Sequence, residues 1–135
     1  MSYIDHLGIA VKSLAEARKF YEKLGLEIMP EETVEAEKVR LMMVPVGESR
    51  LELLEPTAPD STIARFIQKR GEGLHHVAVQ VNDLAGTVER LKAAGTRLIS
   101  DDIKIGAGGH LYVFVHPSST GGVLLELVED APQGV

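Results

Sequence analysis

The 135-residue sequence contains no cysteine and no tryptophan, and aromatic residues make up only 4% of it. Without cysteine there is no disulfide and no thiolate ligand, so any metal site must use imidazole and carboxylate groups. No apolar run approaches the length of about 18 residues that a membrane-spanning helix needs. The 14 basic residues are outnumbered by 20 acidic ones, and the net charge of −6 disfavours nucleic acid and anionic membranes as partners.

The rest of the composition is that of a globular protein, with 44% hydrophobic residues. The length predicts one domain, or two small modules that share a core. The N-terminus begins with a strand-like alternation and shows neither a basic region nor an apolar signal core. We therefore expect a cytoplasmic protein.

The chain repeats its own pattern. The stretch HLGIAV at 6–11 matches HVAVQV at 76–81, an offset of 70 residues, and each is followed by a helical pattern. Each copy ends on a strand with a glutamate inside an aliphatic run, LELL at 51–54 and LELV at 125–128, where the offset has become 74. The repeat predicts two modules with the same fold.

Apolar spacing assigns the same order, β-α-β-β-β, to both modules. The first is expected to hold a strand over 3–11, a helix from Leu14 to Leu24 with Ser13 as its cap, and strands near 26–34, 37–46 and 49–55. The second is expected to hold a strand over 74–82, a helix over 84–94, and strands near 96–100, 111–116 and 122–129. Between them, Asp60 to Arg70 predicts a helix with Asp60 as its cap.

These elements predict an α+β fold in which two pseudo-symmetric βαβββ modules form a curled mixed sheet around a metal cup. Module 1 is expected at about 1–56, a linker helix at about 57–72 and module 2 at about 73–130, within a single domain over 1–135. In each strand the large aliphatic residues share one face, which we expect to pack against the helices.

The histidines and glutamates of the repeat lie on the other face of their strands. A carboxylate inside an aliphatic strand is costly to bury unless it is paired or bound to a metal. Because two histidines and two glutamates recur at matched places, they predict one metal site made of His6, Glu52, His76 and Glu126. The competing interpretation is that both histidines are structural and both glutamates are solvated on an exposed sheet face.

Other polar residues have plainer interpretations. We expect Glu55 to be solvated at a strand end, His75 to be packed or bonded to backbone, and His116 to cap a turn. His110 ends the glycine-rich segment 104–110, where it is either simply exposed or in contact with a substrate. That segment is either a hairpin turn or a set of backbone N–H groups that binds an anion.

The sequence resembles the vicinal oxygen chelate superfamily of glyoxalase-like βαβββ proteins and, within it, the methylmalonyl-CoA epimerase family. The matching stretches span nearly the whole chain: HLGIAV at 6–11, ELLEP at 52–56, GLHHVA at 73–78, KIGAGG at 104–109 and HPSSTGGVLLEL at 116–127. The last is the most specific, because glyoxalase I relatives usually have an Asp-Pro-Asp-Gly type of turn there.

The resemblance implies that the four residues named above bind a divalent ion, with Co²⁺ typical of the family and Ni²⁺, Mn²⁺ or Zn²⁺ as alternatives. It implies interconversion of (2R)- and (2S)-methylmalonyl-CoA, by removal of the C2 proton and formation of a metal-stabilised enolate. Glu126 is the expected first base, and Glu52 or a metal-bound water the second. Some epimerases carry a base on the strand before the turn at 45–50, where our alignment has Arg40, which cannot act as a base near neutral pH.

Coenzyme A is polyanionic and this chain is acidic, so a local basic or amide-rich patch is needed. We expect the CoA thioester to contact these residues, the serines lying near the acyl group: Lys104, Gly106, Gly108, Gly109, Ser118 and Ser119. A homodimer is expected because superfamily members commonly dimerise.

The main alternative is a glyoxalase I-type lactoylglutathione lyase, which uses the same kind of ligand set. The segment from His116 to Glu126 argues against it. Three-ligand resistance transferases and the usually longer extradiol dioxygenases fit less well. Antibiotic binders of this fold lose the metal ligands, whereas here all four are present.

Overall fold

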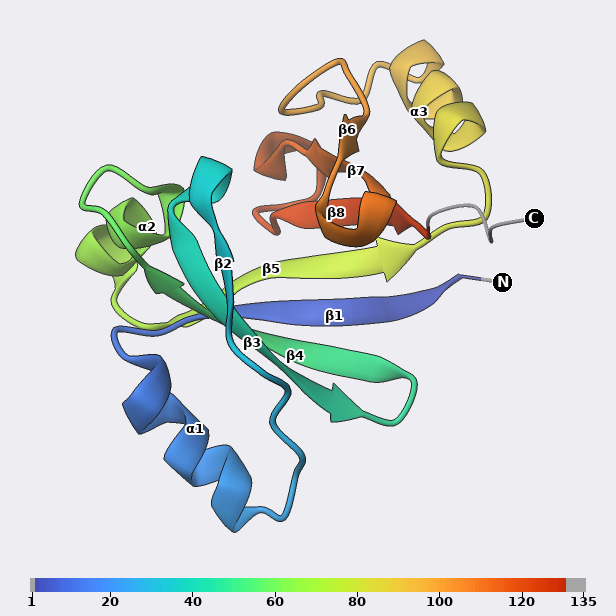
Figure 1. Ribbon diagram of the computed structural model, residues 1–135. Helices are drawn as coiled ribbons and strands as arrows, with labels where there is room; N and C mark the ends of the chain where they lie inside the picture. The colour runs from blue at the N-terminus through green and yellow to red at the C-terminus, as the bar shows by residue number, and fades with distance from the viewer. Residues whose placement is uncertain (1, 131–135) are drawn as a thin grey trace. The chain divides into compact units, whose positions relative to one another are not determined.

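The computed structural model describes residues 2–130, without the side chain of Ala107, and its helices and strands follow the predicted order (Figure 1). The described residues group into two compact units, 6–75 and 76–130 with 2–5. The unit 6–75 is called module 1 below and the other unit module 2, and each is described by itself. No helix within residues 2–130 combines the length and the hydropathy of a membrane span.

Module 1 has the predicted βαβββ order. Its elements are β1 (Tyr3–Ala10), α1 (Leu14–Lys23), β2 (Glu32–Val34), a 3-10 helix (Glu35–Glu37), β3 (Val39–Val46) and β4 (Ser49–Pro56), followed by the linker helix α2 (Thr62–Arg70). The strands adjoin in the order β2-β3-β4-β1, with β1 parallel to β4 and the other neighbours antiparallel. The second strand is much shorter than the predicted 26–34.

The two helices begin at serine caps. The Ser13 hydroxyl accepts the backbone N–H of Glu16 at 3.2 Å, as predicted for α1. For α2 the prediction is wrong by one residue, because the hydroxyl of Ser61, not the carboxylate of Asp60, accepts the N–H of Ala64, at 2.9 Å. The Asp60 carboxylate instead pairs with the ammonium group of Lys38.

Helices α1 and α2 cover opposite faces of the module 1 strands (Figure 1). On the α1 face the buried core is Val11, Leu14, Met42, Val44 and Leu53. On the α2 face it is Ala10, Val39, Leu41, Leu54 and Ile63. The large aliphatic residues of β1 and β4 thus face a helix as expected, but α2 adds a second core on the face that also carries His6 and Glu52.

Module 2 repeats the order. Its elements are β5 (Gly73–Gln80), α3 (Leu84–Ala93), β6 (Lys104–Ile105), a 3-10 helix (Ala107–Gly109), β7 (Leu111–Val115), a 3-10 helix (Pro117–Ser119) and β8 (Leu125–Glu129). The strands adjoin in the order β5-β8-β7-β6. The buried core under α3 consists of Leu84, Val88, Val113, Val115 and Leu127.

The strand predicted near 96–100 is wrong. That segment forms one isolated bridge, Leu98 to Val115, and two flanking backbone bonds, from Ile99 N–H to Phe114 O and from His116 N–H to Arg97 O, both 2.9 Å. This segment and β6 both pair with the edge of β7 that faces away from β8. The segment pairs near Val115, and β6 pairs with Leu111 and Tyr112. Because β6 takes the remainder of that edge, the segment has no room to extend into a full strand.

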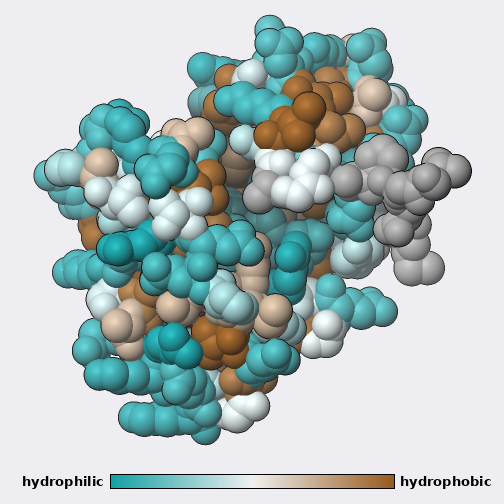
Figure 2. Space-filling model, viewed as in Figure 1, coloured by the Kyte–Doolittle hydropathy of each residue, from teal (hydrophilic) through white to brown (hydrophobic). Residues whose placement is uncertain are grey.

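The face of the molecule drawn in Figure 2 is mostly hydrophilic, and hydrophobic side chains form separate patches on it. This agrees with the 25% of charged residues in the sequence. Several large apolar side chains are nevertheless exposed, among them Phe20, Leu24 and Ile105. Single exposed apolar residues of this kind are normal on globular proteins.

Candidate metal centre

The first predicted ligand pair lies in the middle of the module 1 strands. His6 on β1 is buried, and the side chain of Glu52 on β4 is only 13% exposed. The His6 Nε2 and Glu52 Oε1 atoms are 3.6 Å apart. The strand register sets Gly8 directly opposite Glu52, so no side chain of β1 intervenes at that point. The neighbour on β3 is Met43.

Module 2 holds the matching pair. His76 on β5 and Glu126 on β8 are both buried, with His76 Nε2 and Glu126 Oε1 3.4 Å apart. On β5 the residue opposite Glu126 is the small Ala78. On β7 the residue opposite Glu126 is Phe114. The Phe114 ring meets the His76 imidazole edge to face, with centroids 5.7 Å apart. The repeat in sequence is therefore a repeat in geometry.

Glu126 is buried and the Glu52 side chain is only 13% exposed, which rules out the interpretation that both glutamates are solvated on an exposed sheet face. In both pairs the Nε2 to Oε1 distance exceeds the roughly 2.7–3.2 Å of a good N–H···O hydrogen bond. Two ligands held about 2.1 Å from one ion at a tetrahedral angle would lie about 3.4 Å apart. The residue types, the burial and the spacing within each pair thus fit a divalent cation.

Two further glutamates support these strands, and the sequence reading missed their role. Glu55 Oε1 accepts the backbone N–H of Leu14 at 3.0 Å, and Glu129 Oε1 accepts that of Leu84 at 2.9 Å. The expectation that Glu55 is solvated is wrong, since its side chain is 15% exposed and also pairs with Arg40 at 2.5 Å. The signal was present in the repeat, which reads ELLE at 52–55 and ELVE at 126–129.

Arg40 lies on the face of β3 that turns away from Glu52. It is directly opposite Glu55 in the register, so the two side chains share the α1 face. The residues of β3 that share the face of Glu52 are Val39, Leu41, Met43 and Pro45, none of which can take up a proton. Within the described residues, β3 therefore offers no second base near Glu52.

The glycine-rich segment forms a tight turn between β6 and β7. The N–H of Gly106 donates to the His110 carbonyl at 2.8 Å, and the N–H of Gly109 donates to the Gly106 carbonyl at 3.0 Å. Gly108 and Gly109 have left-handed φ angles of 73° and 82°. Two of the three amides predicted to contact substrate are thus engaged within the turn, while Lys104 is exposed beside it.

The two predicted substrate serines lie in the turn before β8. The Ser118 hydroxyl is 2.8 Å from His116 Nδ1, which also accepts the Ser118 N–H, so His116 caps this turn as predicted. The Ser119 hydroxyl accepts the backbone N–H of Arg97 at 2.9 Å. His75 packs edge to face on Phe66, which agrees with its predicted packing role.

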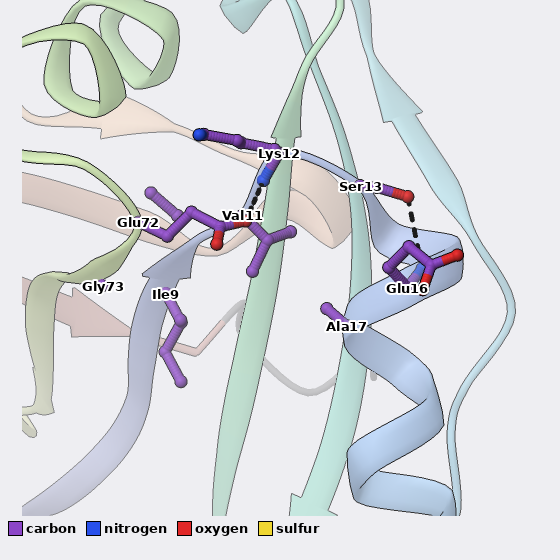
Figure 3. Close-up of a pocket in the computed structure, with 9 residues that line it drawn as sticks. Ile9, Val11, Lys12, Ser13, Glu16, Ala17, Glu72 and Gly73 are labelled. Atoms are coloured by element: carbon purple, nitrogen blue, oxygen red, sulfur yellow. Dashed lines mark hydrogen bonds between the residues drawn. The ribbon is translucent and has the colours of Figure 1, made fainter.

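An open pocket of about 520 Å³ lies at the start of α1 in module 1 (Figure 3). Ile9 and Val11 line its floor, and the Glu72 carboxylate accepts the backbone N–H of Lys12 at 2.7 Å at its edge. Ile9 and Val11 belong to the strand face opposite His6. The pocket is therefore separate from the first ligand pair, and its lining includes no predicted ligand.

Comparison with known proteins places this geometry in a family. Residues 5–114 match the model of the glyoxalase/bleomycin resistance protein/dioxygenase superfamily. The chain is 42% identical to the uncharacterized protein YqjC of Bacillus subtilis, over 99% of this chain and 95% of that protein. It is 39% identical to the mitochondrial methylmalonyl-CoA epimerase of Bos taurus, over 92% of this chain and 72% of that enzyme.

A solved structure is similar over the whole length. A variant of Streptomyces coelicolor methylmalonyl-CoA epimerase in complex with 2-nitronate-propionyl-CoA is 35% identical, with a TM-score of 0.89 over 98% of this chain and 97% of that one. The predicted glyoxalase-type α+β fold is thereby confirmed. The chain belongs to the glyoxalase/bleomycin resistance protein/dioxygenase superfamily and, within it, to the methylmalonyl-CoA epimerase family of isomerases.

Proposed function

We propose that this protein interconverts (2R)- and (2S)-methylmalonyl-CoA with a divalent metal ion held by His6, Glu52, His76 and Glu126. The observation that carries the proposal is the matched His–Glu pair in each module, with three of the four residues buried and the Glu52 side chain only 13% exposed. The choice of substrate is supported by membership of the family that includes the bovine methylmalonyl-CoA epimerase. It is also supported by the Streptomyces coelicolor epimerase, whose structure contains 2-nitronate-propionyl-CoA.

The proposed donor set is two imidazoles and two carboxylates, which suits a borderline divalent ion. We propose Co²⁺ as the native ion, with Ni²⁺, Mn²⁺ and Zn²⁺ as alternatives. When bound, the ion would act as a Lewis acid for the charge that develops on the thioester oxygen. The two histidines are buried and neutral imidazole is the metal-binding form, so metal affinity should fall in acid.

Epimerisation at C2 requires a proton to leave one face and another to arrive on the opposite face. We assign the first transfer to the Glu126 carboxylate. Because Leu41 and Met43 on β3 cannot take up a proton, we assign the opposite transfer to Glu52, with a water molecule as the alternative. Burial among aliphatic residues excludes bulk water, which suits a carboxylate acting as a base on a carbon acid.

We propose that residues of module 2 bind the CoA portion, namely Lys104 and the turn that follows it. Lys104 is exposed and free to approach a phosphate, and the turn contributes Gly106, Gly108 and Gly109. Ser118 and Ser119 are proposed to lie near the acyl group. We further propose a homodimer that acts in the cytoplasm, which sedimentation and fractionation would test.

The deciding experiment is proton NMR of methylmalonyl-CoA in D₂O with purified protein and Co²⁺, with and without EDTA. The expected result is loss of the C2 proton signal only when metal is present, with inversion reported by a stereospecific mutase. No exchange by a metal-loaded protein would overturn the proposal. The glutathione hemithioacetal of methylglyoxal serves as the control substrate, since its turnover would favour the lactoylglutathione lyase.

A further inference from the structure

A continuous series of four rings runs along β7 in module 2. The His76 imidazole meets Phe114 edge to face at 5.7 Å, and Phe114 meets Tyr112 in the same way at 6.0 Å. Tyr112 in turn meets His110 at 5.6 Å, with the two ring planes tilted by 36°. His110, Tyr112 and Phe114 alternate along the chain and share one face, which brings their rings about 6 Å apart, whereas the His76 ring comes from β5.

The outer end of the series lies against the glycine turn. A Cβ atom at Gly106 would come within 2.4 Å of His110 Cε1 and 2.6 Å of Nε2. The imidazole therefore occupies the space that any side chain at position 106 would need. The Gly106 N–H also donates to the His110 carbonyl at 2.8 Å, so the His110 backbone is bonded to this glycine while its ring fills the space beside it.

The inner end of the series lies at the second ligand pair. Phe114 is directly opposite Glu126 in the strand register and touches His76. The ring series thus connects the glycine turn to both candidate ligands of module 2. Packed aromatic pairs contribute to stability beyond their buried area.

From these contacts we infer that His110 is a positioning residue, which holds the turn at Gly106 to Gly109 in place for the CoA thioester through ring packing. The inference rests on the proposed function and deepens it. It assigns His110 no proton transfer and no metal contact. Removal of the His110 ring should therefore weaken substrate binding, while the rate of the chemical step and the metal affinity change little.

The first readout is independent of activity. Amide hydrogen exchange of Gly106 and Gly109 is followed by NMR in the wild type, His110→Ala and His110→Phe. His110→Ala is expected to speed exchange of both amides at least tenfold, and His110→Phe, which keeps a ring, to leave it within about threefold. Equal exchange rates in all three proteins would overturn the inference even if the protein proves to have another activity.

The second readout is steady-state kinetics with methylmalonyl-CoA and saturating Co²⁺. His110→Ala should raise KM about tenfold with kcat within about twofold, and His110→Phe should restore KM. A loss of kcat shared by both variants would show acid–base chemistry and overturn the inference. An inactive wild type would count against the proposed function alone, because the exchange measurement still decides the role of His110.

A double-mutant cycle tests the contact itself. Gly106→Ala should displace the imidazole and raise KM in the wild-type background. In the His110→Ala background the ring is absent, so the same substitution should have little further effect. Additive effects of the two substitutions on KM would show that the ring and the glycine act independently, and would overturn the inference.

Discussion

The Glu129 carboxylate accepts the first backbone N–H of α3, that of Leu84, at 2.9 Å. Glu129 is three residues beyond Glu126 on β8, so the two side chains point to opposite faces of the strand. One strand therefore presents a candidate metal ligand on one face and fixes the start of a helix on the other. The same relationship holds between Glu55 and Leu14 in module 1.

This relationship predicts a stability effect. Glu129→Ala removes an acceptor from the α3 N-terminus and should lower the free energy of unfolding by about 1–2 kcal/mol. Glu129→Gln keeps an acceptor oxygen and should cost less than half as much. Urea denaturation followed by circular dichroism measures both. Equal losses in the two variants would indicate that charge, rather than the hydrogen bond, matters at this position.

Metal binding should depend on Glu126 and not on its neighbour along the strand. Glu126→Gln should reduce Co²⁺ affinity by about tenfold or more in isothermal titration. Mutation of a residue that only hydrogen-bonds to a metal ligand already reduces metal affinity by about that much. Glu129→Gln is the matched control, because Glu129 belongs to the same strand but to the other face. A similar affinity in both variants would argue against Glu126 as a ligand.

The assignment of Glu52 as a base is tested by exchange at C2. Glu52→Gln should slow solvent exchange of the C2 proton by about 100-fold or more for one of the two epimers. Co²⁺ affinity is measured alongside, so that a lost ligand is not mistaken for a lost base. Normal exchange of both epimers by the metal-loaded variant would exclude Glu52 as a base and leave water in that role.

Lys104 is expected to act on the CoA part of the substrate. Lys104→Glu should raise KM for methylmalonyl-CoA by about tenfold at low ionic strength, and the difference should shrink as salt is added. Lys69→Glu, at an exposed position of α2 in module 1, is the charge-matched control. An unchanged KM for the Lys104 variant would remove this residue from the proposed substrate site.

The contact between Lys38 and Asp60 predicts a pH dependence of stability. The hydrogen bond from Lys38 is the main cause that lowers the pKa of the Asp60 carboxyl below its usual 3.8. A lowered folded-state pKa means that the stabilisation is fully present above 3.8 and is lost as the pH falls through the folded value. Asp60→Asn should therefore be less stable than the wild type at pH 7 and equal to it in stronger acid.

Denaturation of the wild type and Asp60→Asn between pH 7 and pH 2 measures this difference. Asp102→Asn, at another exposed aspartate, is the control and should show no such convergence. A stability difference for Asp60→Asn that stays constant down to pH 2 would show that the ionised carboxylate is not its source. The exposure of both partners keeps the expected effect small.

The sequence was most informative where one pattern occurs twice. A single histidine in a strand is ambiguous, but the match between His6 and His76 predicted one site of two histidines and two glutamates, and the structure holds a close His–Glu pair in each module. The starts of α1 and α3 were also predictable, because each combines a capping residue, Ser13 or Asp83, with helical spacing. Local patterns of this kind report on local structure.

The cap of α2 was misplaced by one residue, but three other discrepancies arose where distant residues decide the outcome. Glu55 looked solvated because nothing near it in sequence indicates that α1 begins beside it. The strand expected near 96–100 failed because β6 takes part of the same edge of β7. Similarly, the alignment at Arg40 could not show that this side chain points away from Glu52. Strand register, which long-range pairing sets, decided all three.

The offset between the modules grows from 70 at the helices to 74 at the last strands. The longer connection of module 2 lies between β7 and β8, at residues 116–124, where module 1 has only the two residues Gly47 and Glu48. It is partly offset because β7 and β8 are shorter than β3 and β4. Despite this difference in length, both modules keep the bond between a glutamate of the last strand and the first N–H of the helix, Glu55 to Leu14 and Glu129 to Leu84. One module can therefore carry a longer connection between its last two strands without losing the bond that fixes the start of its helix.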